Sequence, residues 1–287
     1  MSDLAVRPAA VARRWRPHRL HNWELTAGLF VIGLMMLAAL LAPYIAPYQP
    51  NQVNVLVSLQ SPSWHHWMGT DFVGRDVWSR VLYGLRVDML VVAVITYLGL
   101  VIGVIVGTVA GYVGGWVDAI VGRLADTVIA FPFIVLVLAV VAIVGPGLKG
   151  VAIGIIIAGW ALYSRLARSE MLALREQPFI MATRALGYSH LRAIFRHALP
   201  NLVRSSLVYS TVDVVVNMLV LASTSYLGLG QQAPGADLGS IIASGQGYLL
   251  SAWWITTIPG AVLVLFGIGV SLIGDGITRG ELPQGAL

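Results

Sequence analysis

Few side chains in this sequence could do acid–base or binding chemistry, and several of them stand inside long apolar runs. Arg123 and Asp126 lie three residues apart in one run, and Asp213 and Asn217 lie four apart in another. At these spacings each pair shares one face of a helix. Charged side chains inside a membrane are costly and are usually paired or functional. We favour structural pairing with neighbouring helices for these residues, and keep open a place along a transport pathway or its gate.

The histidines and the single lysine of the sequence do not form a pattern typical of a catalytic site. His65 and His66 lie near Asp71, but adjacent histidines in a loop are more often solvent-exposed than metal-bound, and we predict no metal site. The single lysine, Lys149, lacks the Gly-Lys-Ser/Thr context of a phosphate-binding loop. A His-Glu-x-x-His motif, a Gly-x-Ser-x-Gly elbow and suitably placed aspartate pairs are absent, which argues against an intramembrane hydrolase. We therefore expect neither enzymatic activity nor a bound cofactor.

The composition is that of a membrane protein. Hydrophobic residues make up 57% of the 287 residues and charged residues only 11%, whereas soluble domains carry roughly 25% charged residues. Such a composition also excludes disorder. The net charge of +5 comes from basic residues gathered between apolar runs. That distribution fits cytoplasmic loops better than a nucleic-acid-binding face.

Six apolar runs are long enough to cross a bilayer, which takes about 20 residues. Arginines dominate the N-terminal tail (residues 1–24) and the stretch from Arg165 to Arg204. Because positive residues stay inside, both segments and the C-terminal tail (278–287) are predicted to be cytoplasmic. We thus expect an all-α, multi-pass membrane protein. The predicted spans are Leu25–Ile45, Met89–Tyr112, Ile120–Val144, Leu148–Leu166, Leu202–Leu227 and Trp253–Ile273.

The segment 46–88 would then lie outside the membrane. Its apolar residues recur at helical spacing between arginines from Val77 to Leu85, which predicts a short helix lying along the membrane surface. Glycines at 99, 103, 107 and 111 share one face of the second predicted span. We expect them to allow close packing within the chain, with an interface to a partner chain as the alternative.

The most informative segment is the cytoplasmic loop 167–201. Pro178 suits the first turn of a helix, Gly187 suits a helix end with positive φ, and Ser189 can cap the next helix. We predict two short helices joined at Gly187, with Leu199-Pro200 ending the second before the fifth span. Their apolar residues alternate with arginines. Such a hairpin could rest on lipid headgroups or dock into a groove of another protein.

The loop resembles the cytoplasmic "EAA" loop of ABC-importer permeases. Ala182, Gly187, Leu199 and Pro200 match that motif in spacing, whereas Met181 and Thr183 depart from it. Further motifs, in their order and spacing, resemble the dipeptide/oligopeptide/nickel branch of the family. More narrowly, the chain looks like the C-type, or second, permease subunit of such a system. The further motifs are Met68–Asp71, Gly74–Asp76, Ser79-Arg80, Arg123, Asp126, Pro132, Tyr226–Gly230, Trp253-Trp254, Pro259-Gly260 and Gly274–Gly276.

The resemblance implies a type I ABC-importer permease fold in a bacterial inner membrane, with residues 89–277 as the permease core. It also implies partners: a homologous second permease, two ATP-binding subunits that hold ATP and Mg²⁺, an external substrate-binding protein, and membrane lipid. Relatives carry peptides, nickel complexes, glutathione, opines or sugars. The 178–200 loop would couple to an ATP-binding subunit through Phe179, Ala182, Ala185, Leu186, Gly187, Leu191, Phe195, Leu199 and Pro200.

One rival is a stand-alone secondary transporter that uses Asp126 or Asp213 to carry protons. Such transporters often contain an internal repeat, and the sequence shows no convincing one. We therefore prefer the ATP-driven importer.

Overall fold

The structure, a computed structural model, describes residues 23–281, and it describes their side chains apart from those of 182–185 and 279–281. Most of the predicted tail 1–24, the last six residues of the predicted tail 278–287, and the side chains of Ala182 and Ala185 therefore lie outside the described residues. Within the described part the chain is helical, and an isolated bridge between Thr70 and Asp76 is its only β pairing.

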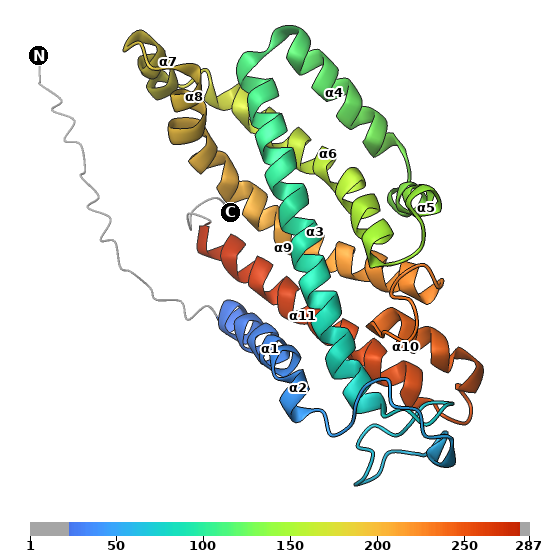
Figure 1. The fold of residues 1–287 in the computed structure, drawn as a ribbon. Helices are drawn as coiled ribbons and strands as arrows, with labels where there is room; N and C mark the ends of the chain where they lie inside the picture. Colours follow the sequence, from blue (N-terminus) through green and yellow to red (C-terminus); the bar gives the residue numbers. More distant parts are fainter. Residues whose placement is uncertain (1–22, 282–287) are drawn as a thin grey trace, which may run out of the picture.

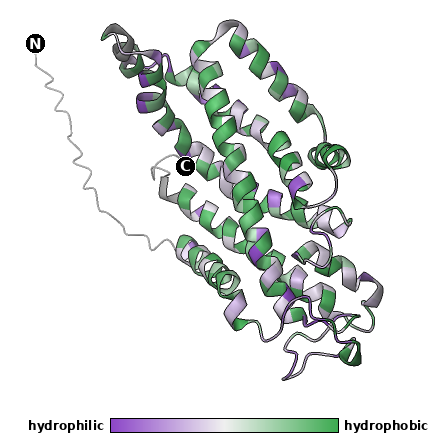
Figure 2. Ribbon diagram, in the orientation of Figure 1, coloured by the Kyte–Doolittle hydropathy of each residue, from purple (hydrophilic) through white to green (hydrophobic). Residues whose placement is uncertain are grey.

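The helices form one elongated bundle (Figure 1). Apolar residues run along the long helices, and hydrophilic ones gather mostly at their ends and in the connections (Figure 2). The elements are α1 (Trp23–Leu40), α2 (Ala42–Ile45), η1 (Val55–Val57), α3 (Val77–Val113), α4 (Gly115–Ala130), α5 (Phe133–Val144), α6 (Leu148–Leu174), α7 (Pro178–Ala185), α8 (His190–Arg192), η2 (Ala193–Ala198), α9 (Leu199–Tyr226), α10 (Leu238–Gly245), η3 (Gln246–Tyr248) and α11 (Trp254–Glu281).

Five stretches of the described chain are single helical segments long and apolar enough to cross a membrane, and the bent pair of α4 and α5 makes a sixth. The predicted third span, Ile120–Val144, is thus present but broken. Its two halves meet at an angle of 95°, with Pro132 directly before α5. A proline lacks the N–H that a continuous helix requires and bends or breaks the helix at its position.

The helix predicted to lie on the membrane surface is not a separate element. Residues from Val77 onward are the first turns of α3, which continues unbroken for 37 residues. Val77, Val81 and Leu85 are buried in the main hydrophobic core. The apolar stripe therefore faces the protein interior instead of lipid headgroups, and the pattern we interpreted as amphipathic on a membrane is that of a helix packed on protein.

The glycine stripe packs within the chain, as we expected. A side chain at Gly103, Gly107 or Gly111 would overlap residues of α6, including the backbone of Ser164 and of Arg168. Gly99, by contrast, has open space around it. Three of the four glycines thus let α3 and α6 approach closely, which fixes the central pair of the bundle.

Candidate functional site

The predicted pair of short helices is present between α6 and α9. Helix α7 begins at Pro178, and Gly187 has a φ of 74° between the two helices. The Ser189 hydroxyl caps α8 by accepting the backbone N–H of Arg192 at 3.4 Å. These local features follow directly from residue type, because proline, glycine and a capping serine act over three or four positions.

The expected break at Leu199-Pro200 was wrong. The chain stays helical from His190 to Tyr226, with π-helical turns at Ala193–Ala198 directly before α9. The N–H of Leu199 bonds to the carbonyl of Ile194, five residues earlier. The wider π turn makes room for the Pro200 ring without ending the helix. The second half of the loop is therefore a direct extension of the α9 span.

The loop has two distinct faces. Ile180 and Ile194 are buried in a small core with Tyr112 of α3 and Met171 of α6. The predicted docking residues lie mainly on the outside, where Phe179, Leu186, Leu191 and Phe195 are exposed by 46 to 71%. Pro200 is also exposed and Leu199 is partly exposed. The inner face holds the loop on the bundle, and the outer face leaves an apolar surface free within the described residues.

Polar contacts reinforce the inner face. The Tyr112 hydroxyl is hydrogen-bonded to His190 Nδ1 at 3.2 Å, and Arg175 donates to the Gly111 carbonyl, also at 3.2 Å. Both contacts are made at the C-terminal end of α3. Our sequence analysis did not foresee these anchors, because Tyr112 was counted only as the end of a span and Gly111 only as part of the glycine stripe.

The residues considered for a pathway or gate lie in two different places. Asp213 and Asn217 are buried inside the bundle, where Asp213 Oδ2 accepts from the Tyr163 hydroxyl and the Asn217 amide, both at 2.9 Å. The Asn217 amide also donates to Thr96 at 2.8 Å. This network joins α3, α6 and α9, so its geometry supports the structural interpretation that we favoured.

Arg123 and Asp126 do not form a pair with each other. Asp126 lies 3.9 Å from Arg165 of α6, and both side chains are largely exposed. The stronger link between α4 and α6 is a two-pronged ion pair in which Arg168 donates to both oxygens of Asp118, at 2.7 Å for the Nη2 contact. We did not single out Asp118 from the sequence.

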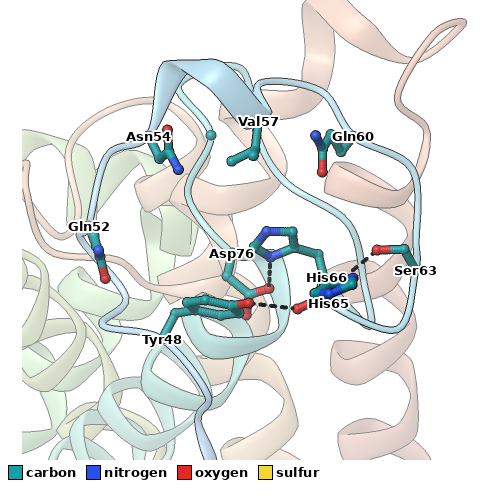
Figure 3. A pocket seen from close by; sticks show the side chains of 10 residues that line it. Tyr48, Gln52, Asn54, Val57, Gln60, Ser63, His65, His66 and Asp76 are labelled. Atoms are coloured by element: carbon teal, nitrogen blue, oxygen red, sulfur yellow. Dashed lines mark hydrogen bonds and ion pairs between the residues drawn. The ribbon is translucent and has the colours of Figure 1, made fainter.

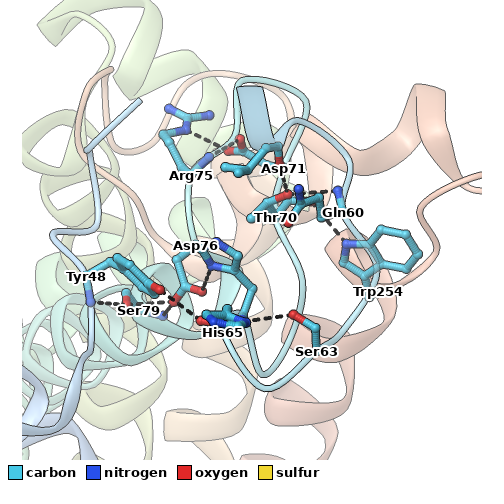
Figure 4. Close-up of polar contacts among 12 residues, drawn as sticks. Tyr48, Gln60, Ser63, His65, Thr70, Asp71, Arg75, Asp76, Ser79 and Trp254 are labelled. Carbon is cyan, nitrogen blue, oxygen red and sulfur yellow. Dashed lines mark hydrogen bonds and ion pairs between the residues drawn. The ribbon is translucent and has the colours of Figure 1, made fainter. Parts of the chain in front are cut away.

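The N-terminal end of α3, away from the two-helix loop, is preceded by a folded lobe. It comprises residues 46–76, and we call it the α3 lobe (Figure 4). Two carboxylates organise it. Asp71 accepts the backbone N–H groups of Val73 and Arg75 and pairs with the Arg75 guanidinium at 2.6 Å. Asp76 caps α3 by accepting the Ser79 N–H at 2.8 Å. The motif Gly-Thr-Asp…Gly-Arg-Asp…Ser is thus the frame of this lobe.

A second aspartate pair links α3 to α10. Asp237 caps α10 with a reciprocal Ser240 contact, and Asp88 of α3 accepts the Leu238 N–H at 2.9 Å. The role of Asp237 could have been predicted from the sequence, because an aspartate directly before an apolar helical segment is a typical N-cap residue. The role of Asp88 could not have been predicted in this way, because its partner, Leu238, lies 150 residues away along the chain.

Within the described residues, no group of three or more His, Asp or Glu side chains is arranged to hold a metal ion. The histidine–aspartate set considered from the sequence is divided between different partners. His66 pairs with Asp76 at 2.9 Å, and Asp71 pairs with Arg75.

Comparison with known proteins gives this geometry its context. Residues 99–280 match the family described as binding-protein-dependent transport system inner membrane component. Residues 21–62 match the N-terminal TM domain of oligopeptide transport permease C.

Several curated proteins are similar over most of their length. A putative peptide transport system permease of Brucella abortus is 37% identical and covers 96% of this chain and 92% of its own. The dipeptide transport system permease DppC of Alkalihalophilus pseudofirmus is 38% identical, with 90% of this chain and 84% of its own covered. The probable D,D-dipeptide transport system permease DdpC of Escherichia coli is 36% identical, with coverage of 86% and 83%.

A solved structure shows the same fold. An inward-facing form of the MetNI methionine ABC transporter aligns with a TM-score of 0.54 and 23% identity, over 71% of this chain and 97% of that one. The chain therefore belongs to the inner membrane components of binding-protein-dependent transport systems, as a multi-pass ABC-importer permease of the oligopeptide C type with a type I fold.

Proposed function

We propose that this chain forms half of the translocation pathway of an ATP-driven importer of peptides or similar small solutes, beside a homologous second permease. The names of its relatives support the substrate class. Family membership favours this function over a stand-alone proton-coupled transporter. The buried, neutral hydrogen-bond donors around Asp213 also suit a structural role better than a proton relay.

Coupling to the ATP-binding subunits runs through the loop 178–200. The observation that carries this assignment is the two-sidedness of the loop. Its inner face is buried against α3 and α6, so the exposed apolar residues, such as Leu191 and Phe195, point elsewhere. An apolar face left free on a rigidly anchored helix pair is what docking into a protein groove requires. A hairpin resting on headgroups would instead turn its apolar face to the membrane.

The remaining assignments follow from this arrangement. ATP and Mg²⁺ would bind to the partner subunits, so this chain would be no enzyme and would hold no cofactor. With six crossings, both termini would be cytoplasmic and the α3 lobe external, where a substrate-binding protein delivers the solute. Figure 1 shows α7 and α8 at the other end of the bundle from the α3 lobe, as this orientation needs.

Purification of the tagged chain from native membranes in mild detergent tests the proposal. We expect a second permease and ATP-binding subunits to co-purify, together with ATPase activity. A chain recovered alone in several mild detergents, without ATPase activity but with proton-driven solute uptake in vesicles, would overturn it.

A further inference from the structure

The α3 lobe contains a cavity that none of the roles above uses. It has a volume of about 310 Å³ and lies between the α2–η1 segment and the loop that leads into α3. Figure 3 shows the side chains of Asn54 and Gln60 in its upper part, Gln52 at its left, the ring of His66 near its centre and Tyr48 below. Its size is at the lower end of the range of small-molecule sites, about 300–1,000 Å³.

His66 is held firmly in the cavity wall. Its residue surface is 8% exposed, and its ring stacks on Tyr48 with 4.7 Å between centroids. Nδ1 lies 2.9 Å from Asp76 Oδ1, while Asp76 Oδ2 accepts the Ser79 N–H and hydroxyl. A carboxylate in this position holds the proton on Nδ1 and leaves Nε2 as an acceptor.

The Nε2 atom has no hydrogen-bond partner among the described residues. A ring nitrogen that borders a cavity and has no protein partner can accept from a ligand's N–H or O–H group. In the tautomer that Asp76 favours, His66 Nε2 would accept a hydrogen bond from a ligand that carries a donor group.

The charged side chains that line the cavity indicate whether the ligand's donor group is neutral or cationic. Among the described residues, Asp76 is the one Asp, Glu, Lys or Arg side chain that lines the cavity, together with the histidines His65 and His66. The nearest arginine in sequence, Arg75, is paired with Asp71 at 2.6 Å. The Asp76 carboxylate therefore places a negative charge beside the cavity, and a negative charge favours a cationic donor. Amide side chains around it can both donate to and accept from a peptide bond.

We propose that this cavity binds the ammonium end of a short peptide, with His66 Nε2 accepting from the α-ammonium group and Asp76 supplying the negative charge. The substrate class rests on the proposed function. The site itself is distinct from a pathway through the spans, because it lies entirely in the lobe.

The test compares two probes on one protein. Trialanine and N-acetyl-trialanine differ at the amino end, where acetylation removes the positive charge, leaves one N–H donor and adds a small acetyl group. Binding would be measured by calorimetry on the assembled permease complex in nanodiscs, without the external binding protein. We expect trialanine to bind and the acetylated probe to bind roughly tenfold more weakly or not at all, because a charge-assisted hydrogen bond is lost. Equal binding of both probes, or of neither, would overturn the proposal.

Variants locate the binding. His66→Phe keeps the stacking on Tyr48 and removes Nε2, and should lower trialanine affinity by roughly tenfold or more. Gln60→Met removes one amide from the wall with less risk to the fold and should weaken binding by a smaller factor. His197→Phe changes a histidine in the cytoplasmic loop and should have no effect. Trialanine binding that survives both His66→Phe and Gln60→Met would place the peptide elsewhere and refute the site.

The two proposals can fail separately. ATP-driven peptide uptake by the complete system, together with absent binding in the cavity, would refute the site alone. Ammonium-selective binding by a complex that shows no ATP-driven peptide uptake would refute the proposed function alone.

Discussion

The indole N–H of Trp254 donates a hydrogen bond to the backbone carbonyl of Thr70, at 3.1 Å and 184 residues away along the chain. Trp254 is the first residue of α11, and Thr70 belongs to the α3 lobe. Thr70 in turn accepts the Gln60 N–H at 2.9 Å and donates to the Val57 carbonyl. The lobe is therefore fastened to the last span as well as to α3.

Replacing Trp254 with Phe should loosen that attachment. The substitution keeps an aromatic ring but leaves a buried carbonyl unsatisfied, which costs about 1–3 kcal/mol. Scanning fluorimetry of the purified protein should show a lower melting temperature. Trp253→Phe is the matched control, because that neighbouring side chain is 52% exposed. Equal losses in the two variants would contradict the role of the hydrogen bond.

Gly74→Ala should disrupt the α3 lobe. Gly74 has a φ of 77°, and a side chain there would overlap the Asn54 carbonyl. Gly115 has a φ of 58° with nothing near an added methyl group. Gly115→Ala should therefore lower the free energy of unfolding only by the cost of placing an alanine in the left-handed backbone conformation, which is about 1–2 kcal/mol. Limited proteolysis should cut within the lobe of the first variant at protease levels that spare the second; similar resistance would count against the close contact.

Gly187→Pro should abolish transport and leave membrane insertion intact. A proline fixes φ near −65°, whereas this position has a φ of 74°. A steric clash is not the reason for the expected loss, since nothing lies within 4 Å of a Cβ added at Gly187. Gly187→Asn should retain much of the activity, because asparagine tolerates the left-handed region. Vesicle uptake assays would check both variants, and normal uptake by a well-inserted proline variant would argue against the coupling role.

Phe195→Asp should reduce the recovery of ATP-binding subunits with the purified permease. Phe195 is 46% exposed, so the change should not harm the permease fold, but a charge would be poorly tolerated in an apolar groove. Phe195→Leu keeps the surface apolar and should preserve the complex. Undiminished recovery with the aspartate variant would indicate that this face rests on lipid.

Asp213→Asn should leave transport close to the unmodified level. The amide oxygen of asparagine can still accept from Tyr163 and Asn217, which are the two donors found at Asp213. Asp213→Leu should instead destabilise the bundle, because each unsatisfied donor costs about 1–3 kcal/mol. Uptake and melting temperature would be measured together. Loss of uptake in a stable Asp213→Asn protein would revive the proton-coupled mechanism.

How much of this architecture the sequence could predict depended on the range of each interaction. Pro178, Gly187 and Ser189 act locally, so the two-helix loop was predictable. Hydropathy located every span, since it depends on about 20 neighbouring residues. The prolines were less informative: Pro132 marks a 95° break, whereas Pro200 is absorbed by a π turn. A proline alone does not specify which of these will occur.

Interactions between distant residues were not predictable in this way. The Tyr163–Asp213 contact joins residues 50 apart, and the Asp88–Leu238 contact joins residues 150 apart. Such pairs depend on how helices pack, and one sequence contains no record of that packing. Similarly, the apolar stripe beginning at Val77 fits a membrane surface or a protein core equally well. Only the fold decides between the two.

The length of α3 has a mechanical consequence. Its first turn is capped by Asp76 of the lobe, and Tyr112 near its last turn is hydrogen-bonded to His190 of the 178–200 loop. With 37 unbroken residues, the helix is about 55 Å long. Pivoting such a rod by about 5° around its midpoint would move each end by about 2.4 Å in opposite directions. Events on the two sides of the membrane could thus be linked by the leverage of one stiff helix.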